Sequence, residues 1–329
     1  MAPSFNFNNN IDYMPSVSII LPVYNGIKYL SPSVYSVLTQ DFTDFEFLVL
    51  DDCSTDGSWE WLQSLDDKRV SLFRNQQNRG LFYNLNFLIN KSSSSIIKLW
   101  SQDDVLYPNC IGTIVAFHRQ YPKIGFSYTA RDYINEWGND LNIEQQDDTP
   151  EIVSTALHAR IAFFTGSIAG NIANVALNKF ALDKVGLFNE QMKISGDFEM
   201  WVRLAKDYPV GFINKPLVQL RNHDGQLSGQ KKYFIYHLKE DIQVYQMLLV
   251  YVNEIQKKEG WKLLRNHKLL FYYTLMLKEF IHGRFSTGWS FLNRLHQFDN
   301  IFLLTFYYVK NRIFFKNIPY VSKETGSDL

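Results

Sequence analysis

Two hydrophobic patterns alternate along the first half of the chain, and this alternation is the feature that most constrains the fold. Short apolar runs with β-branched residues are typical of buried strands, whereas apolar residues spaced by three or four positions indicate amphipathic helices. The predicted strands are Val17–Val23, Phe45–Leu50, Val70–Phe73, Ile96–Trp100 and Ile124–Thr129. The predicted helices between them are Ile27–Leu38, Ser58–Leu65, Leu81–Asn90 and Pro108–Tyr121.

A chain that alternates in this way is expected to build an α/β fold. Each strand–helix–strand unit makes a right-handed crossover, so the sheet is mostly parallel and helices cover both of its faces. After a polar loop at Asp132–Pro150, the patterns predict a helix at Ile152–Phe164, a strand at Asn174–Leu177 and a helix at Phe198–Lys206.

The last third of the chain follows a different pattern, because the alternation stops at about Lys231. Helical patterns replace it over Tyr233–Lys257, Lys262–Phe280, Trp289–Arg294 and the aromatic run Ile301–Phe315. A Gly- and Ser-rich stretch near Gly225–Gln230 marks the change. We therefore predict three parts: a flexible N-terminal segment over residues 1–15, an α/β domain over residues 16–228, and a helical, aromatic-rich C-terminal region over residues 229–329.

The charge balance and the cysteines narrow the function classes. Lys and Arg total 33 and Asp and Glu total 33, so the basic excess of a nucleic-acid binder is missing and no nucleic-acid partner is expected. Cys53 and Cys110 lack metal-site spacing, which predicts two reduced thiols in a cytoplasmic protein. Residues Met1–Met14 do not resemble a signal peptide, and no apolar run reaches the roughly 18 residues of a membrane-spanning helix.

Polar clusters follow three of the predicted strands. They are Pro22–Asn25, Asp51–Asp52 and Gln102–Asp104. Ligands of parallel α/β sheets bind beyond the carboxyl ends of the strands, where these clusters fall. Acids there suit a Mg²⁺ or Mn²⁺ ion that takes its other ligands from water and substrate phosphates. Taken singly, each cluster also has a structural interpretation: a core tyrosine, an ordinary strand-to-helix loop, or a solvated turn that caps a helix.

The order and spacing of the three clusters together resemble the family 2 glycosyltransferases. The resemblance covers Ser16 to Ser228. It implies the A-type (GT-A) fold of nucleotide-diphospho-sugar transferases, with a Rossmann-like, mostly parallel sheet flanked by helices. It also implies transfer of a sugar from a nucleotide-diphosphate donor, by default a UDP-sugar, to an acceptor hydroxyl with the help of Mn²⁺ or Mg²⁺.

The resemblance also assigns roles to single residues. The nucleotide side would comprise Pro22, Tyr24, Asn25, Asp52, Arg79 and Gln102, with Tyr24 and Asp52 on the base. The metal would be held by Asp103, with Asp104 beside it and His223 completing the shell; a loop histidine is also commonly a solvated surface group. Ser101 departs from the family, which has an aspartate at that position.

The acceptor side of the resemblance centres on Asp197. It matches the family's catalytic base, which takes the proton from the acceptor hydroxyl; as an alternative it caps the helix that follows, and Glu199 is then the fallback base. Other residues expected on the diphosphate or acceptor side are Gly170, Asn171, Glu199, Trp201 and Arg221.

One base and no nucleophile pair imply a single displacement with inversion at the anomeric carbon. The processive synthases of the family carry a Gln-x-x-Arg-Trp motif that is missing from this sequence, so one transfer per acceptor is expected. Polysaccharide or glycoconjugate synthesis on a saccharide, lipid-linked or protein acceptor fits this prediction. The rival interpretations are a non-catalytic nucleotide-sugar-binding partner of a transferase complex, and a nucleotidyltransferase, which usually has a more Gly- and Lys-rich phosphate loop than Tyr24–Lys28.

The C-terminal region leaves two interpretations open. Ile301–Val309 is apolar and too short to span a bilayer, and Lys310, Arg312 and Lys316 follow it. A basic, aromatic segment of this kind fits peripheral contact with the inner face of a membrane. Packing against the α/β domain or in a homodimer interface is the alternative, and we favour it for a segment of this length.

Overall fold

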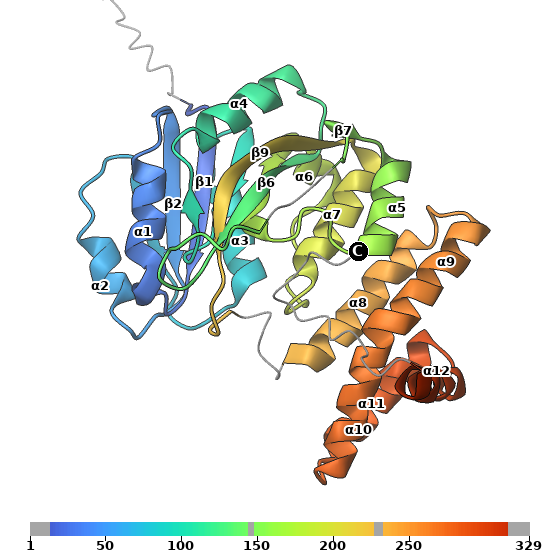
Figure 1. Cartoon of the computed structure of the whole chain (residues 1–329). Coiled ribbons are helices and arrows are strands. Elements are labelled where there is room, and N and C mark those ends of the chain that lie inside the picture. The colour runs from blue at the N-terminus through green and yellow to red at the C-terminus, as the bar shows by residue number, and fades with distance from the viewer. Residues whose placement is uncertain (1–13, 144–147, 227–232, 315–329) are drawn as a thin grey trace, which may run out of the picture.

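A computed structural model describes residues 14–143, 148–226 and 233–314. The predicted flexible segment therefore lies almost wholly outside the described residues, as do Ser228, Lys231, Phe315, Lys316 and part of the stretch Gly225–Gln230. Figure 1 shows an α/β layer structure, with the C-terminal helices packed at one side of it.

Within the described residues, nine strands form one sheet in the order β3-β2-β1-β4-β8-β6-β9-β5, with β7 paired to β9. Strands β1 to β4 are mutually parallel, β8 is antiparallel to β4 and β6, and β9 is parallel to β6. The mostly parallel sheet is thus confirmed. The strands are β1 Val17–Val23, β2 Phe45–Asp51, β3 Val70–Arg74, β4 Ile96–Leu99, β5 Val105–Leu106, β6 Phe126–Ile134, β7 Ile152–Val153, β8 Val175–Asn178 and β9 Val210–Arg221.

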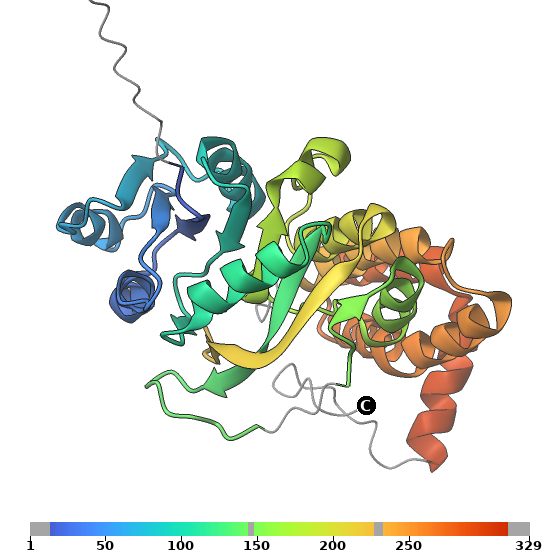
Figure 2. The ribbon, with the colours of Figure 1, turned by 90° about the horizontal axis from the view of Figure 1, so that it is seen from above.

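Helices cover both faces of this sheet, as the view from above shows (Figure 2). Successive residues of β1 serve opposite layers: Ile19 and Leu21 join one apolar core with α1 and α4, whereas Ile20 joins the other with α3, α5 and α7. This alternation is what a strand buried on both faces requires. The helices of this part are α1 Ile27–Leu38, α2 Ser58–Gln63, α3 Leu81–Lys91, α4 Cys110–Gln120, α5 Thr155–Thr165, α6 Lys179–Val185 and α7 Gly196–Asp207, with the 3₁₀ turn η1 Ile172–Asn174.

The sheet differs from the sequence prediction at two neighbouring strands, β6 and β9. The strand predicted at Ile124–Thr129 runs on to Ile134, so the polar loop begins later than Asp132. Strand β9 was not predicted at all. Its middle residues Asn214–Pro216 are exposed, and the pairing with β6 shifts register there, so the two-residue hydrophobic period is interrupted.

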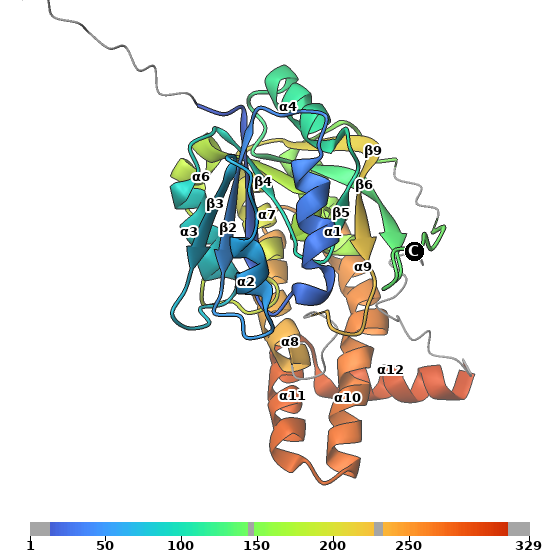
Figure 3. The same cartoon turned by 90° about the vertical axis from the view of Figure 1, so that its left-hand side faces the viewer.

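The C-terminal helices share a core with the α/β layers. Val244, Tyr245 and Leu248 of α8 belong to the same buried cluster as Trp201 of α7. Figure 3 shows α10 and α11 projecting away from the sheet with α12 crossing them. These elements are α8 Phe234–Leu248, α9 Glu254–Leu264, the π-helical turn η4 Arg265–Leu269, α10 Leu270–Ile281, α11 Phe285–Phe298 and α12 Ile301–Phe314. None of the helices in the described parts of the chain is long and apolar enough to cross a bilayer.

Candidate active site

A large cleft opens where β1, β2 and β4 end. Its volume is about 1510 Å³, which exceeds the roughly 300–1,000 Å³ typical of a site for one small molecule. The cleft therefore has room for more than one small molecule. The predicted site residues that line it are Pro22, Tyr24, Asn25, Asp52, Arg79, Gln102, Asp103, Asp104, Gly170, Asn171, Asp197 and His223.

Asp52 organises one wall of this cleft. Its Oδ1 accepts hydrogen bonds from Arg79 N at 2.8 Å and from Asn75 Nδ2 at 2.7 Å, and its Oδ2 accepts one from Gly80 N at 2.9 Å. The side chain is 2% exposed. The carboxylate therefore fixes the turn at residues 78–80, which presents Arg79 to the cleft. Both carboxylate oxygens already accept hydrogen bonds from this part of the protein.

Gln102 has a similar structural task. Its Oε1 accepts a hydrogen bond from Tyr24 N at 2.8 Å, and its Nε2 donates one to Tyr24 O at 3.1 Å. Gly26 makes room for this amide, because a Cβ on that residue would lie 2.4 Å from Gln102 Oε1. The predicted ribose contact of Gln102 thus competes with a pair of bonds that joins the loop after β1 to the loop after β4.

Tyr24, Asn25 and Arg79, which were predicted on the nucleotide side, are exposed to solvent in the cleft. Tyr24 is 47% exposed, so its ring is available for stacking. Asn25 adopts φ 48° and its Oδ1 accepts a hydrogen bond from Thr55 N at 2.9 Å, which joins the loops after β1 and β2. The Arg79 guanidinium lies 4.3 Å from the centre of the Tyr83 ring, so the cation is held at the cleft wall.

Asp103 and His223 meet at the floor of the cleft, with 3.4 Å between Asp103 Oδ2 and His223 Nε2. The Nε2 atom is buried and has no hydrogen-bond partner, while Nδ1 accepts a bond from Gly225 N at 3.2 Å. That bond places the proton of a neutral imidazole on Nε2. His223 therefore faces Asp103 as a donor in this arrangement, and it offers a lone pair to a cation only if the Gly225 contact is released.

The neighbouring carboxylates of Asp103 and Asp104 diverge. Asp104 is 2% exposed, and its Oδ1 accepts a hydrogen bond from Arg221 N at 2.8 Å. Burial, opposed by that bond, raises the pKa of Asp104 to about 7. Asp104 therefore anchors the end of β9, and this bond occupies one of its two carboxylate oxygens.

Arg221 was expected beside the diphosphate, but the structure buries it. Its Nε donates to Asp103 O at 2.9 Å, and one terminal nitrogen donates to Asn135 O at 3.1 Å and to Glu136 O at 3.2 Å. The side chain is 4% exposed and does not line the cleft. Arg221 thus ties the loop after β6 to the loop after β4, because carbonyl oxygens satisfy its donors.

Asp197 lies in the first turn of α7, and the capping position is Ser195. The carboxylate is partly buried, lines the cleft, and accepts a hydrogen bond from Phe198 N at 2.7 Å. Burial raises the pKa of Asp197 to about 7, and the negative charges of Asp241 and Glu240 act in the same direction. A carboxyl group with this pKa can exchange protons near neutral pH.

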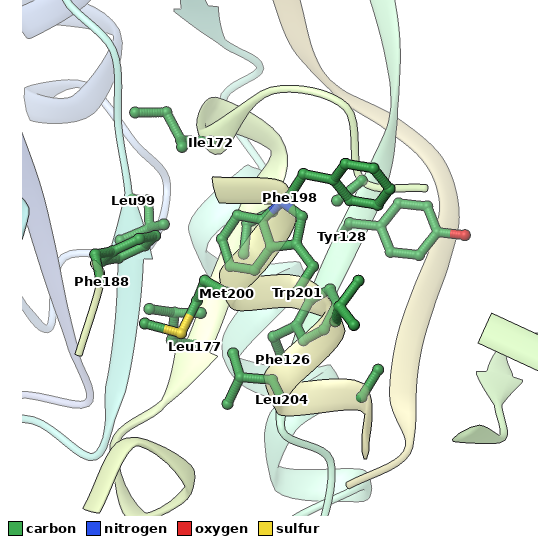
Figure 4. Close-up of a cluster of buried hydrophobic side chains, with 14 of the residues drawn as sticks. Leu99, Phe126, Tyr128, Ile172, Leu177, Phe188, Phe198, Met200, Trp201 and Leu204 are labelled. Carbon is green, nitrogen blue, oxygen red and sulfur yellow. The ribbon is translucent and has the colours of Figure 1, made fainter. Parts of the chain in front are cut away.

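Trp201 and Glu199 were expected beside the substrates, but the structure buries both side chains away from the cleft. Trp201 is fully buried, with its ring 5.1 Å from that of Phe126, in the core drawn in Figure 4. Glu199 is 8% exposed and pairs with Arg203 at 2.6 Å. Glu199, two positions after Asp197, points to the opposite side of α7, whereas Trp201, four positions after, lies one turn further along the same side and is covered by the core.

The sequence profile described as "Glycosyl transferase family 2" matches residues 18–183, half of the chain. The chain belongs to glycosyl transferase family 2. The matched part carries the loops that hold Tyr24, Asp52, Arg79 and Asp103, and it ends before Asp197 and His223.

Relatives within the family agree with this assignment. An uncharacterised glycosyltransferase of Rickettsia felis is 28% identical over 222 residues, which is 67% of this chain and 36% of that protein. The putative colanic acid biosynthesis glycosyl transferase WcaA of Escherichia coli K12 is 28% identical over 198 residues, 59% of this chain and 67% of WcaA. The chain thus spans about a third of the length of the Rickettsia relative.

A solved structure shows the same fold. Residues 1–349 of S. aureus TarS, in complex with UDP-GlcNAc, superimpose with a TM-score of 0.64 over 86% of this chain and 80% of that one, at 19% identity. The GT-A fold predicted from the family resemblance is confirmed by this likeness.

Two residues of the C-terminal region support the segment before Asp197 in this glycosyltransferase family member and were not predicted. Glu240 and Asp241 of α8 are 3% and 4% exposed and contact the segment just before Asp197. The available signal was a pair of adjacent acids within a helix that has an apolar, buried face. It was overlooked because the region from Lys231 onward resembled nothing in the family.

Proposed function

We propose that the protein transfers a sugar from a nucleotide-diphosphate sugar to an acceptor hydroxyl with inversion. The observation that carries this proposal is that Asp103 and Asp197 line one cleft, and that Asp103 follows β4 within the segment that the family matches. Asp103 lies on the nucleotide side with Arg79. Asp197 faces the same space from α7, with a pKa suited to accepting a proton at neutral pH.

The donor is proposed to be a UDP-sugar. The exposed Tyr24 ring provides a stacking surface for a base, and Arg79 supplies a positive charge for a phosphate. TarS, which shares the fold, was solved with UDP-GlcNAc bound. The identity of the sugar is left to a donor screen.

Asp103 is proposed to hold a Mn²⁺ or Mg²⁺ ion. Among the described residues, no group of three or more His, Cys, Asp or Glu side chains converges on one point. One carboxylate nevertheless suffices when substrate phosphates and water complete the shell. The unpartnered Nε2 of His223, directed at Asp103, fits a second ligand once its imidazole changes tautomer. Such an ion neutralises the charge on a departing diphosphate.

The proposed reaction is one displacement. Asp197 accepts the proton of the acceptor hydroxyl, and the oxygen forms a bond to the anomeric carbon from the face opposite the diphosphate. The bond between that carbon and the diphosphate oxygen breaks, and the nucleoside diphosphate leaves with the electron pair. The anomeric configuration is therefore inverted, and a product with retained configuration contradicts this mechanism.

The acceptor is proposed to be a saccharide, free or lipid-linked, as the colanic acid assignment of WcaA suggests. A protein acceptor, peripheral membrane contact through α12, a cytoplasmic location and a homodimer remain predictions. Exposed Phe302, Phe306 and Val309 on α12, followed by Lys310 and Arg312, are consistent with contact to an anionic surface.

The first experiment measures thermal unfolding with UDP, GDP, dTDP and CDP, each with and without Mn²⁺. Saturation at about 100 times the dissociation constant adds about 2.7 kcal/mol of stability, which is readily seen. A shift with UDP that requires Mn²⁺ supports the donor class and the metal. Binding without any transfer to saccharides or water favours a non-catalytic nucleotide-sugar-binding protein, and release of pyrophosphate from a nucleoside triphosphate favours a nucleotidyltransferase.

A further inference from the structure

Helix α8 holds the segment that leads into the Asp197 turn by a set of short hydrogen bonds. Glu240 Oε1 accepts a bond from Lys193 N at 2.7 Å, and Glu240 Oε2 accepts bonds from Ile194 N at 2.9 Å and Ser195 N at 2.8 Å. Three successive backbone N–H groups thus converge on one buried carboxylate. Bonds of this charge-assisted kind are about twice as strong as neutral ones.

The start of α7 is also fixed from outside the helix. A serine at the capping position usually accepts a bond from a backbone N–H of the first turn. Ser195 makes no such bond; its Oγ donates to Asp241 Oδ1 at 3.0 Å. Gly196 is confined on the opposite side, because a Cβ on it would lie 2.6 Å from the Phe82 ring of α3. The turn that carries Asp197 is therefore packed against α3 and hydrogen-bonded to α8.

A third link anchors α8 itself. Lys268, in the π-helical turn η4, lies 2.5 Å from Asp241 Oδ2. Burial lowers the pKa of Lys268, but the charge of Asp241 outweighs it, so the pKa is raised and the ammonium stays charged. The contacts form one path from the C-terminal helices to the predicted base. Lys268 pairs with Asp241, and Asp241 and Glu240 accept hydrogen bonds from residues 193–195, which lead directly to Asp197.

We propose that Glu240 and Asp241 are positioning residues for Asp197, so that the C-terminal helical region is part of the catalytic apparatus. This proposal rests on the proposed function, because it assumes that Asp197 is the base. It also extends beyond the matched family segment, which ends at residue 183. Displacement of a reacting group by about 1 Å can cost on the order of 10²-fold in rate, so a rigid support for this turn has a clear catalytic use.

The first test compares Glu240→Gln with Asp299→Asn. The glutamine keeps the size of the side chain but replaces one accepting oxygen by an NH₂ group, which cannot accept from an N–H. Asp299 is a matched control, because it is a partly buried acid of the same region, paired with Arg265 at 2.5 Å through its carboxylate. Hydrogen–deuterium exchange of residues 193–195 is expected to accelerate at least tenfold in Glu240→Gln and to stay unchanged in Asp299→Asn.

Turnover provides the second readout, as release of UDP from UDP-GlcNAc with water or an added saccharide as acceptor. In Glu240→Gln, kcat is expected to fall on the order of 10²-fold, while KM for the donor changes less than twofold. In Asp299→Asn, kcat is expected to stay within twofold at a temperature where the variant is folded. An equal loss of kcat in both variants overturns the proposal, since it indicates only a general loss of stability.

The pH profile separates positioning from mere structural support. Removing the charge of Glu240 lowers the pKa of Asp197, so the pH at which kcat rises moves to a lower value. Lys268→Met leaves the negative charge of Asp241 uncompensated, so the pH at which kcat rises moves to a higher value. If the pH dependence of kcat is unchanged in both variants, the proposal is contradicted. The charged groups near Asp197 are Glu240 and Asp241 from α8, Lys268 behind them, Glu190 and Lys193 in the cleft wall, and Glu199 paired with Arg203.

A readout without turnover keeps this proposal distinct from the proposed function. The ¹³C resonance of the Asp197 carboxyl carbon, assigned with Asp197→Asn, reports its pKa directly. If the wild-type protein turns over no donor, the proposed function fails, yet the exchange rates and this titration still decide whether α8 positions Asp197. Unaltered exchange and titration in Glu240→Gln overturn the positioning role whatever the activity.

Discussion

At the scale of single residues, the acidic side chains around the cleft differ in burial and in hydrogen-bond partners, and so they have different roles. Asp103 faces the cleft, whereas Asp104, one position along, bonds to the backbone of β9. Asp52 is saturated by backbone and amide donors, whereas Asp197 retains accepting capacity toward the cleft. The chemistry proposed for this site therefore depends on two carboxylates, and these can be tested one at a time.

Asp103→Asn is expected to abolish the Mn²⁺-dependent part of the stabilisation by UDP, because a neutral amide is a poor ligand for a hard cation. Turnover should fall by at least 10²-fold. Thermal unfolding without ligands should change little, since the Asp103 side chain accepts no short hydrogen bond in the described structure. Metal-dependent stabilisation that persists in this variant contradicts the role of Asp103.

Asp197→Asn is expected to lower kcat on the order of 10²–10⁴-fold, the usual contribution of a general base. Donor affinity, measured by titration calorimetry, should stay the same. In the wild-type protein, activity should rise with pH through a midpoint near 7, because only the ionised carboxylate accepts a proton. A variant that retains its full activity leaves Asp197 without a catalytic role.

The same pKa has the opposite effect on stability. The pKa of Asp197 is raised to about 7 in the folded protein from an ordinary value of 3.8, so the folded state binds the proton more tightly. Stability that this group contributes is complete below pH about 4 and is lost as the pH rises toward 7. Urea unfolding at pH 4.5 and pH 8 should show a smaller pH dependence for Asp197→Asn than for the wild-type protein.

At the scale of elements, the strand-to-helix loops were predictable and the side-chain directions were not. The strands β1, β2 and β4 and the polar residues after them follow from hydrophobic period and from the rule for strand ends. Arg221 and Trp201 were placed at the substrates by their position in a motif. A motif fixes order along the chain, but the register of β9 and the packing face of α7 decide where these side chains point.

Two glycines give a matched test of the loop after β1. Gly26→Ala pushes a methyl group into the Gln102 amide, breaks its bonds to Tyr24, and should cost about 1–3 kcal/mol of stability. Gly112→Ala, inside α4, meets Phe42 only at ordinary contact distance and should add about 0.5–1 kcal/mol. UDP binding should weaken in the first variant alone. Equal stabilities of the two variants, measured by urea unfolding, contradict this account of the loop.

At the scale of the whole molecule, the predicted boundary near residue 228 marks a change in pattern along the sequence, while the packing continues across it. Tyr245 of α8 lies 5.8 Å from Phe163 and 6.0 Å from Phe198, ring to ring. Composition could reveal that the last third is helical. It could not reveal that α8 completes a core begun more than a hundred residues earlier, because that depends on contacts distant in sequence.

Truncation should therefore have unequal effects. A chain that ends after Gln226 exposes the apolar faces of α5 and α7 and is expected to aggregate or to lack a cooperative unfolding transition. A chain that ends after Asn300 loses α12 and the residues that follow it, and should retain the UDP-dependent stabilisation. Circular dichroism melting with and without UDP measures both outcomes. A cooperative, UDP-binding protein ending at Gln226 would show that the α/β domain is autonomous.

The burial of Arg221 has a mechanical consequence for the cleft. One guanidinium group is bonded to a carbonyl of the metal-motif loop and to two carbonyls of the turn that carries Trp137. Neither loop can swing outward alone without leaving buried donors unsatisfied. We therefore expect the two loops to move together, so that a substrate that shifts one of them also displaces the other.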